Sequence, residues 1–210
     1  MKNLWIFDFD GTLVNSEIAI RNCYLKVAQK LIPERIDFVK NITIGPTLEE
    51  TTSLILNKEK IYLKDEFIQK FQIEYDEKIV LETPIYPNVN EVLIKLKNRG
   101  DSLCILTNKR SLPTKKLLKH YKWTNHFDWI ACADMFPAQK NKSEVLRKQK
   151  INEGDYKNIY VVGDTIADGL AANSKNYRFI KANYGYGKNQ DWKNIIIFSE
   201  INNILDILLI

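Results

Sequence analysis

Short apolar runs recur along the chain, and each has polar or turn-forming residues beside it. Runs of three to four β-branched or aromatic residues of this kind are typical of buried strands. We expect five strands, at Leu4–Phe7, Leu103–Leu106, Trp129–Ala131, Ile159–Val162 and Tyr177–Ile180. Between the later runs, apolar positions recur with helical spacing. One expected helix has Val89, Val92, Leu93 and Leu96 on one face and ends at Gly100. Three more are expected at Leu112–Tyr121, Ser143–Lys150 and Ile166–Ser174. Alternating strands and helices predict an α/β protein with a parallel sheet covered on both faces.

The segment from Asn15 to Thr83 interrupts this alternation, because it contains helical patterns but no convincing strand. Its expected helices are Glu17–Leu31, a pair around Phe38 and Leu48–Leu56, and a long helix with Phe67, Phe71, Tyr75 and Ile79 on one stripe. We interpret the aromatic stripe as core. The segment is too long for an ordinary connection. We therefore predict an inserted helical domain at residues 15–83 and an α/β domain at residues 1–14 and 84–210.

The composition is that of a soluble globular protein. The chain has 210 residues, of which 45% are hydrophobic and 27% charged, and its net charge is +5. The basic residues are 25 Lys but only 6 Arg, whereas phosphate-reading surfaces favour the bidentate Arg fork. We therefore do not expect nucleic acid as a partner. The predicted insert carries −2 and the remainder +7. We interpret the basic residues of one later segment as a solvated helix face: Lys109, Arg110, Lys115, Lys116, Lys119 and Lys122.

Other classes of protein are also disfavoured. The three cysteines are far apart and form no CxxC pair, and the two histidines lack metal-ligand spacing. A disulfide framework and a zinc site are therefore not expected. The apolar run at the N-terminus is too short for a signal peptide, and no stretch approaches the ~18 apolar residues of a membrane span. We expect a cytoplasmic protein without a membrane partner, and the sequence does not indicate an oligomeric state.

Two acidic pairs follow predicted strands. Asp8 and Asp10 end the first strand, and residues two apart on extended chain project to the same side. Asp164 and Asp168 follow the run Ile159–Val162 and lie about one helical turn apart. Carboxylates this close repel each other unless a cation or shared proton intervenes. Hard oxygen ligands in modest number fit Mg²⁺, which also takes phosphate oxygens.

Phosphate-binding candidates lie between these pairs. Thr107 and Asn108 follow the strand Leu103–Leu106 and offer a hydroxyl and backbone N–H groups. Lys140 and Lys142 precede the fourth strand, and a lysine there can neutralise phosphate charge.

These segments together resemble the haloacid dehalogenase superfamily, in its phosphoglycolate-phosphatase-like branch with a helical cap. Four motifs of the superfamily occur in order: Asp8–Ser16, which has Asn15 where Asp is common; Leu106–Lys109; Lys142, with Lys140 as the alternative and without the usual following Pro; and Gly163–Asp168. Ile44–Glu49 resembles the branch's cap loop, and Tyr184–Gly187 resembles its late Gly-Tyr-Gly turn. The resemblance spans nearly the whole chain.

The resemblance implies a Rossmann-like parallel sheet core with an inserted α-helical cap, and a phosphatase mechanism. Asp8 would attack phosphorus and form an aspartyl-phosphate, with Asp10 as general acid and then general base. Mg²⁺ would be held by the side chains of Asp8 and Asp164 and the backbone carbonyl of Asp10, with Asp168 nearby. The remaining implied roles are phosphate binding by Thr107, Asn108 and Lys142, and substrate specificity from the cap loop residues Gly45, Pro46 and Thr47.

The expected substrate is a small phosphorylated metabolite, and phosphoglycolate, nucleotides, pyrophosphate and sugar phosphates all remain open. A phosphomutase of the β-phosphoglucomutase kind shares all four motifs. A dehalogenase of the same fold would need neither Asp10 nor a Mg²⁺-binding pair. A non-catalytic phosphate-binding regulatory protein is disfavoured because all the implied catalytic and metal residues are present.

Overall fold

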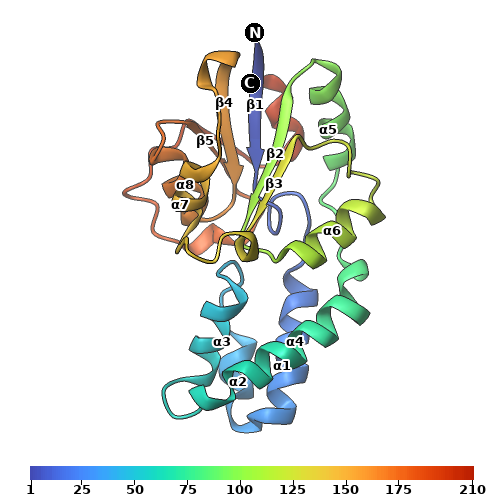
Figure 1. The fold of residues 1–210 in the computed structure, drawn as a ribbon, viewed down its shortest axis with the longest axis vertical. Helices are drawn as coiled ribbons and strands as arrows, with labels where there is room; N and C mark the ends of the chain where they lie inside the picture. The colour runs from blue at the N-terminus through green and yellow to red at the C-terminus, as the bar shows by residue number, and fades with distance from the viewer.

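A parallel sheet forms one end of the molecule and a group of helices the other (Figure 1). The computed structural model describes residues 1–210. The sheet order is β3-β2-β1-β4-β5-β6, and all neighbouring strands are parallel, which confirms the predicted Rossmann-like parallel sheet. The strands are β1 (Lys2–Phe7), β2 (Ser102–Thr107), β3 (Trp129–Cys132), β4 (Tyr156–Gly163), β5 (Arg178–Ala182) and β6 (Ser199–Ile201). Both chain termini lie at the end of the sheet that is farther from the helical group.

Helices cover both faces of the sheet. One face carries α5 (Val89–Asn98), α6 (Ser111–His120) and a C-terminal 3-10 helix (Ile204–Leu209), and the other carries α7 (Lys142–Lys148) and α8 (Ile166–Asn173). Strand β1 shows why its apolar run is continuous. Trp5 and Phe7 pack into the core on the α5 side, while Leu4 and Ile6 pack on the α7 side. A strand buried on both faces needs apolar residues at every position.

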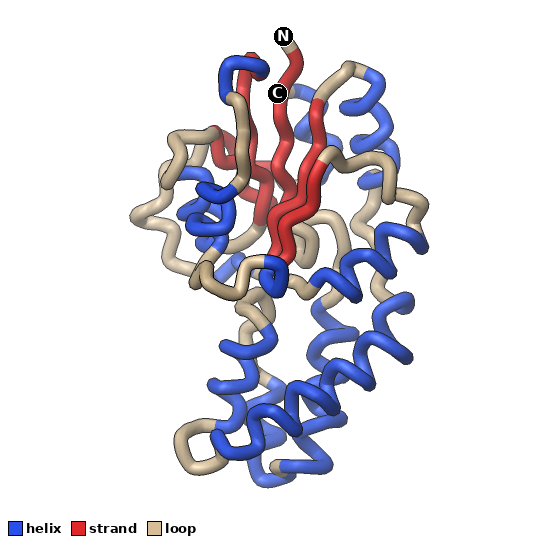
Figure 2. Tube along the Cα trace, in the orientation of Figure 1, coloured by secondary structure: helices blue, strands red, loops and turns tan.

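The helical segment, residues 15–83, packs together below the sheet, where Figure 2 shows helices and loops but no strand. Its α-helices are α1 (Glu17–Leu31), α2 (Ile36–Lys40), α3 (Leu48–Leu56) and α4 (Lys64–Glu74). A π-helical turn (Tyr75–Ile79) and a 3-10 turn (Val80–Glu82) continue α4 toward the sheet. Short 3-10 turns complete the chain at Pro33–Arg35, Ile61–Leu63, Ala133–Met135, Glu153–Asp155 and Gly187–Asn189.

Most predicted elements are present, with two corrections. The sixth strand was missed, because Ser199–Ile201 has only three residues and no apolar run. The long helix predicted with Phe67 to Ile79 on one stripe is interrupted at Tyr75, where the hydrogen bonding changes to the π pattern. The prediction that the aromatic stripe belongs to the core is confirmed, since all four of its residues are buried.

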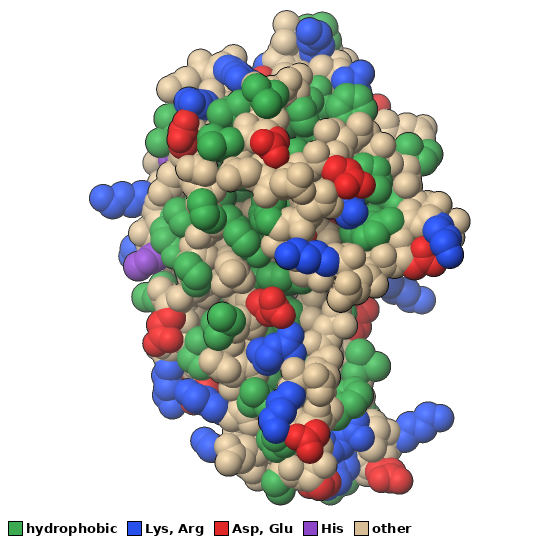
Figure 3. Space-filling view, turned by 180° about the vertical axis from the view of Figure 1, so that it is seen from behind, with side chains coloured by type: hydrophobic (Ala, Val, Ile, Leu, Met, Phe, Trp, Pro, Cys, Tyr) green, Lys and Arg blue, Asp and Glu red, His purple; other side chains and the backbone are tan.

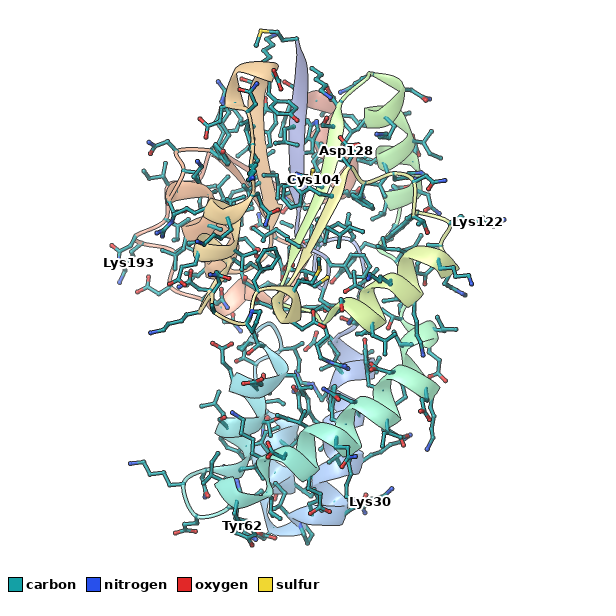
Figure 4. All side chains as sticks on the ribbon, in the orientation of Figure 1. Lys30, Tyr62, Cys104, Lys122, Asp128 and Lys193 are labelled. Carbon is teal, nitrogen blue, oxygen red and sulfur yellow. The ribbon has the colours of Figure 1, made fainter.

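Charged side chains of both signs are interspersed on the face shown in Figure 3. Figure 4 places Lys122 and Lys193 at opposite sides of the molecule, with both side chains directed outward. It also places Cys104 within the sheet, and the three cysteines are buried and unpaired. None of the helices combines the length and the apolar composition needed to cross a lipid bilayer.

Candidate active site

The predicted site residues meet where strand order reverses, at the carboxyl edge of the sheet. Strand β1 lies between β2 and β4, and Phe7 pairs in register with Ile105 and with Val162. Asp8 therefore leaves β1 beside the end of β2 and the end of β4. The backbone N–H of Asp8 donates to the carbonyl of Val162 at 2.8 Å, which fixes the start of the loop. Ligands of open α/β sheets bind at such a switch point.

Three carboxylates gather at this edge. Oxygen atoms of Asp8, Asp164 and Asp168 lie within 4.8 Å of one another, and all three residues are buried. Asp164 accepts hydrogen bonds from the Thr12 hydroxyl (3.2 Å) and from the backbone N–H of Tyr186 (2.6 Å). These contacts come from the loops after β1 and β5. Residues far apart in the sequence therefore orient one metal-binding candidate.

Asp168 is oriented by the start of its own helix. Its Oδ2 accepts from the backbone N–H of Thr165 (3.0 Å) and from the Thr165 hydroxyl (2.7 Å), as expected of an acidic residue in a first helical turn. Its Oδ1 accepts from the ammonium of Lys142 at 2.6 Å. The same ammonium lies 2.7 Å from Asp8 Oδ1. Lys142 is buried, whereas Lys140 is exposed, so only Lys142 reaches the cluster.

The charges of this cluster do not balance. Three carboxylates face one ammonium, which leaves two negative charges uncompensated when all four groups are ionised. Burial and the neighbouring Asp168 raise the pKa of Asp8 to about 7, and burial together with Asp8 raises the pKa of Asp164. Burial opposes the charge of Lys142, but Asp168 and Asp8 outweigh it and raise the pKa of this lysine. A divalent cation would relieve the repulsion, and the oxygen donor set fits Mg²⁺.

Two glycines allow the backbone to approach Asp164 closely. Gly11 has a φ of +85°, and a Cβ there would lie 2.4 Å from Asp164 Oδ2. A Cβ on Gly185 would lie 2.3 Å from the Cβ of Asp164. Both distances are too short for any side chain. The backbone at Gly11 and at Gly185 of the late Gly-Tyr-Gly turn therefore packs directly against the Asp164 carboxylate.

Asp10 lies apart from the three-carboxylate cluster. Its Oδ1 and Oδ2 accept hydrogen bonds from the ammonium of Lys109 at 3.0 and 3.1 Å, and the Ser16 hydroxyl also donates to Oδ1. Its side chain is therefore not among the grouped metal-binding candidates. The expected metal contact of Asp10 through its backbone carbonyl remains a prediction.

The candidate phosphate-binding residues and the candidate cap-loop residues lie near the carboxylates at the same edge of the sheet. Thr107 is buried at the end of β2, and its hydroxyl accepts from the backbone N–H of Lys109 at 3.1 Å. The side-chain amide of Asn108 donates to the carbonyl of Gly45 at 3.1 Å, which joins the sheet edge to the helical segment. Thr47 caps α3, because its hydroxyl accepts from the backbone N–H of Glu50.

A cavity of about 70 Å³ lies between the sheet edge and the helical segment. Asp8, Asp10, Thr107 and Asn108 line it from the sheet side. The helical segment contributes apolar and aromatic side chains together with the loop Gly45–Pro46; the main ones are Ile20, Tyr24, Ile44, Leu48, Phe71 and Tyr75. A wider groove, lined by Gly45–Thr47, Asn108 and Lys142, opens toward solvent.

Three basic residues after β2 have contacts that the sequence did not predict, and one of them, Lys116, is half-buried and donates to the backbone carbonyl of Asp76 at 2.7 Å. The interpretation as a solvated helix face is wrong for Lys109, which is buried and donates to Asp10 and to the Tyr75 hydroxyl. It is also wrong for Arg110, which forms a bidentate ion pair with buried Asp76 at 2.7 and 3.0 Å. The position of Lys109 directly after Thr107-Asn108 was the only available signal.

Comparison with known proteins gives consistent matches over most of the chain. The family model described as haloacid dehalogenase-like hydrolase matches residues 5–182. The phosphoglycolate phosphatase of Psychrobacter arcticus is 27% identical, with 99% of this chain and 96% of the relative covered. The phosphoglycolate phosphatase of Aquifex aeolicus is 30% identical, with coverage of 87% and 85%. A crystal structure of a predicted phosphatase from Clostridium acetobutylicum has a TM-score of 0.82 at 23% identity over 100% of both chains, which shows a shared fold.

Proposed function

The chain belongs to the haloacid dehalogenase-like hydrolase family, and we propose that it is a Mg²⁺-dependent phosphatase that hydrolyses a small phosphomonoester. The relatives named phosphoglycolate phosphatases support this activity. The observation that carries the proposal is the position of Asp8. Its carboxylate borders the cavity, lies 2.7 Å from the Lys142 ammonium and shares a buried cluster with Asp164 and Asp168.

Asp8 is the proposed nucleophile. One of its oxygens attacks phosphorus, the bond to the leaving oxygen breaks, and Asp10 gives that oxygen its proton. The product of this step is an aspartyl-phosphate on Asp8 and a free alcohol. Water then attacks phosphorus, loses a proton to Asp10 and breaks the bond to Asp8. Inorganic phosphate leaves, and both carboxyl groups return to their starting states.

Charge stabilisation comes from groups fixed before the reaction. Lys142, the Thr107 hydroxyl and Asn108 are the proposed partners of the phosphoryl oxygens. The side chains of Asp8 and Asp164 and the backbone carbonyl of Asp10 would hold Mg²⁺, with Asp168 nearby. When bound, Mg²⁺ supplies positive charge that lets an anionic carboxylate approach an anionic phosphate.

The helical segment is proposed to act as a cap. In this division, residues 15–83 form the cap, and residues 1–14 and 84–210 form the core. The cavity of about 70 Å³ lies between this cap and the core, so the cap residues that line it are placed to contact the leaving group. Gly45 and Pro46 line this cavity and Thr47 lines the adjoining groove, so the three are the proposed cap-loop contribution to specificity.

Hydrolysis of p-nitrophenyl phosphate tests the proposal. Activity should require Mg²⁺, disappear with EDTA, and disappear in Asp8→Asn. The matched control is Asp37→Asn, since Asp37 is an exposed carboxylate outside the site and its replacement should leave turnover unchanged. Acid-quenched wild-type protein should carry a phosphoryl adduct by intact mass, and Asp8→Asn should lack it. Turnover that persists without metal, or in Asp8→Asn, would refute the proposal.

A further inference from the structure

The carboxyl group of Asp10 accepts hydrogen bonds from a buried lysine and from the Ser16 hydroxyl. Lys109 Nζ lies 3.0 and 3.1 Å from the two carboxylate oxygens and donates a further hydrogen bond to the Tyr75 hydroxyl at 2.8 Å. Only 8% of Lys109 is exposed. Its ammonium also lies 4.7 Å from the centre of the Tyr75 ring. The lysine is thus enclosed by one core carboxylate and one tyrosine of the cap.

The three residues come from separate parts of the chain. Asp10 follows β1, Lys109 follows β2, and Tyr75 opens the π-helical turn of the cap. The next residue of that turn, Asp76, pairs with Arg110, and its backbone carbonyl accepts from Lys116 at 2.7 Å. The π-helical turn is therefore attached to the start of α6, and this attachment brings Tyr75 to Lys109.

Burial of Lys109 makes its partners necessary. A buried ammonium is stable only where hydrogen-bond partners replace water, and here the Asp10 carboxyl oxygens and the Tyr75 hydroxyl are those partners. A charged group in a buried site has few alternative positions once its hydrogen bonds are made. Movement of the cap away from the core would remove the Tyr75 hydroxyl and admit water to the ammonium.

We propose that Lys109 is a positioning residue that sets the Asp10 carboxyl group for proton transfer, and that Tyr75 fixes Lys109 there when the cap is closed. This inference rests on the proposed phosphatase function. Proton transfer to the leaving oxygen matters most when that oxygen is strongly basic. If Lys109 positions Asp10, the drop in kcat/KM on removing Lys109 should be larger for a more basic leaving group. A general structural defect should lower kcat/KM equally for all leaving groups.

Two substrates with different leaving groups provide the test. p-Nitrophenolate departs without protonation, whereas the alkoxide of a simple alkyl phosphate such as propyl phosphate needs a proton. In Lys109→Met, kcat/KM for the alkyl phosphate should fall ~10–100-fold, because general-acid catalysis typically contributes about 10²–10⁴-fold and much of it would be lost. The fall in kcat/KM for p-nitrophenyl phosphate should be far smaller. The KM for the alkyl phosphate should change little. Tyr75→Phe, which keeps the ring, should show a smaller loss with the same selectivity.

Controls separate this inference from its alternatives. Lys115→Met, at an exposed position of α6, should leave both activities unchanged. In an Asp10→Asn background, Lys109→Met should add little further loss, because both changes act on the same proton transfer. Equal losses for both substrates, a loss confined to KM, or no loss in either variant would overturn the inference. Inactivity of the wild-type protein toward both substrates would instead count against the proposed function.

Discussion

The ion pair between Asp76 and Arg110 links the cap to the core and offers a direct test of how strongly the two are joined. The guanidinium donates to both carboxylate oxygens, at 2.7 and 3.0 Å. The Asp76 side chain is 7% exposed and the Arg110 side chain 18% exposed. Asp76→Ala removes the carboxylate and leaves the guanidinium without its bidentate partner.

The expected loss follows from this burial. Removing one partner of a buried ion pair costs about 3–5 kcal/mol. Arg110 is partly exposed and can turn toward water, so we expect a smaller loss than for a fully buried pair, about 2–3 kcal/mol. At about 2–4 °C per kcal/mol for a chain of this length, Tm should fall by roughly 4–12 °C.

Urea unfolding of a double-mutant cycle measures the pair itself. Asp76→Ala, Arg110→Ala and the double variant should give a coupling energy of about 1–2 kcal/mol. The matched control is the pair Glu91–Lys95 on α5, which is equally short at 2.6 Å but about half exposed on both sides. Its coupling should be only about 0.3–0.5 kcal/mol. If the coupling energy of Asp76–Arg110 is no larger than that of Glu91–Lys95, the buried pair does not stabilise the contact between the cap and the core.

The carboxylate cluster supports further tests. Lys142→Ala should lower kcat/KM for p-nitrophenyl phosphate by ~10²-fold or more, whereas exposed Lys140→Ala should barely change it; the reverse ranking would identify Lys140 as the phosphate lysine. Because Asp8 has a pKa of about 7 when folded, its contribution to metal-free stability is present below about pH 4 and lost as pH rises through about 7. Mg²⁺ must displace that proton, so it should raise Tm more at about pH 8 than at about pH 6, and equal shifts would contradict the assignment. Gly11→Ala should abolish this Mg²⁺-dependent rise in Tm, because the added Cβ would collide with the Asp164 carboxylate. The control is Gly100→Ala, which has a similar φ of +82° but open space around it and should keep the rise. Equal behaviour of the two variants would exclude the contact with Asp164 as the cause.

Much of the fold could be predicted because its signals are local. The apolar run of β1 reflects burial on both faces, and the spacing of Val89, Val92, Leu93 and Leu96 reflects one buried face of α5. The strand Ser199–Ile201 could not be predicted, because only one of its three residues is buried and its pairing with β5 is a long-range contact.

The candidate site also contains residues that the sequence could predict and contacts that it could not. Asp8, Asp164 and Asp168 could be chosen because carboxylates that follow neighbouring parallel strands must meet at one edge of the sheet, and the structure brings these three together. The separation of Asp10 from them could not be predicted, since it depends on Lys109 being buried beside Tyr75. A lysine in a basic segment carries no local sign that it is enclosed.

The sequence alone determined five of the six strands, most of the helices, the helical character of residues 15–83 and the identity of the acidic residues at the strand ends, because backbone periodicity and residue type are local properties. Only the tertiary structure decided which side chains share a hydrogen bond or a charge. It brought Lys142 to Asp8 and Asp168, and it brought Lys109 to Asp10 and Tyr75. The physical reason is that burial and pairing depend on how segments far apart in the chain pack against one another, and a buried charge is stable only where such packing supplies its partners.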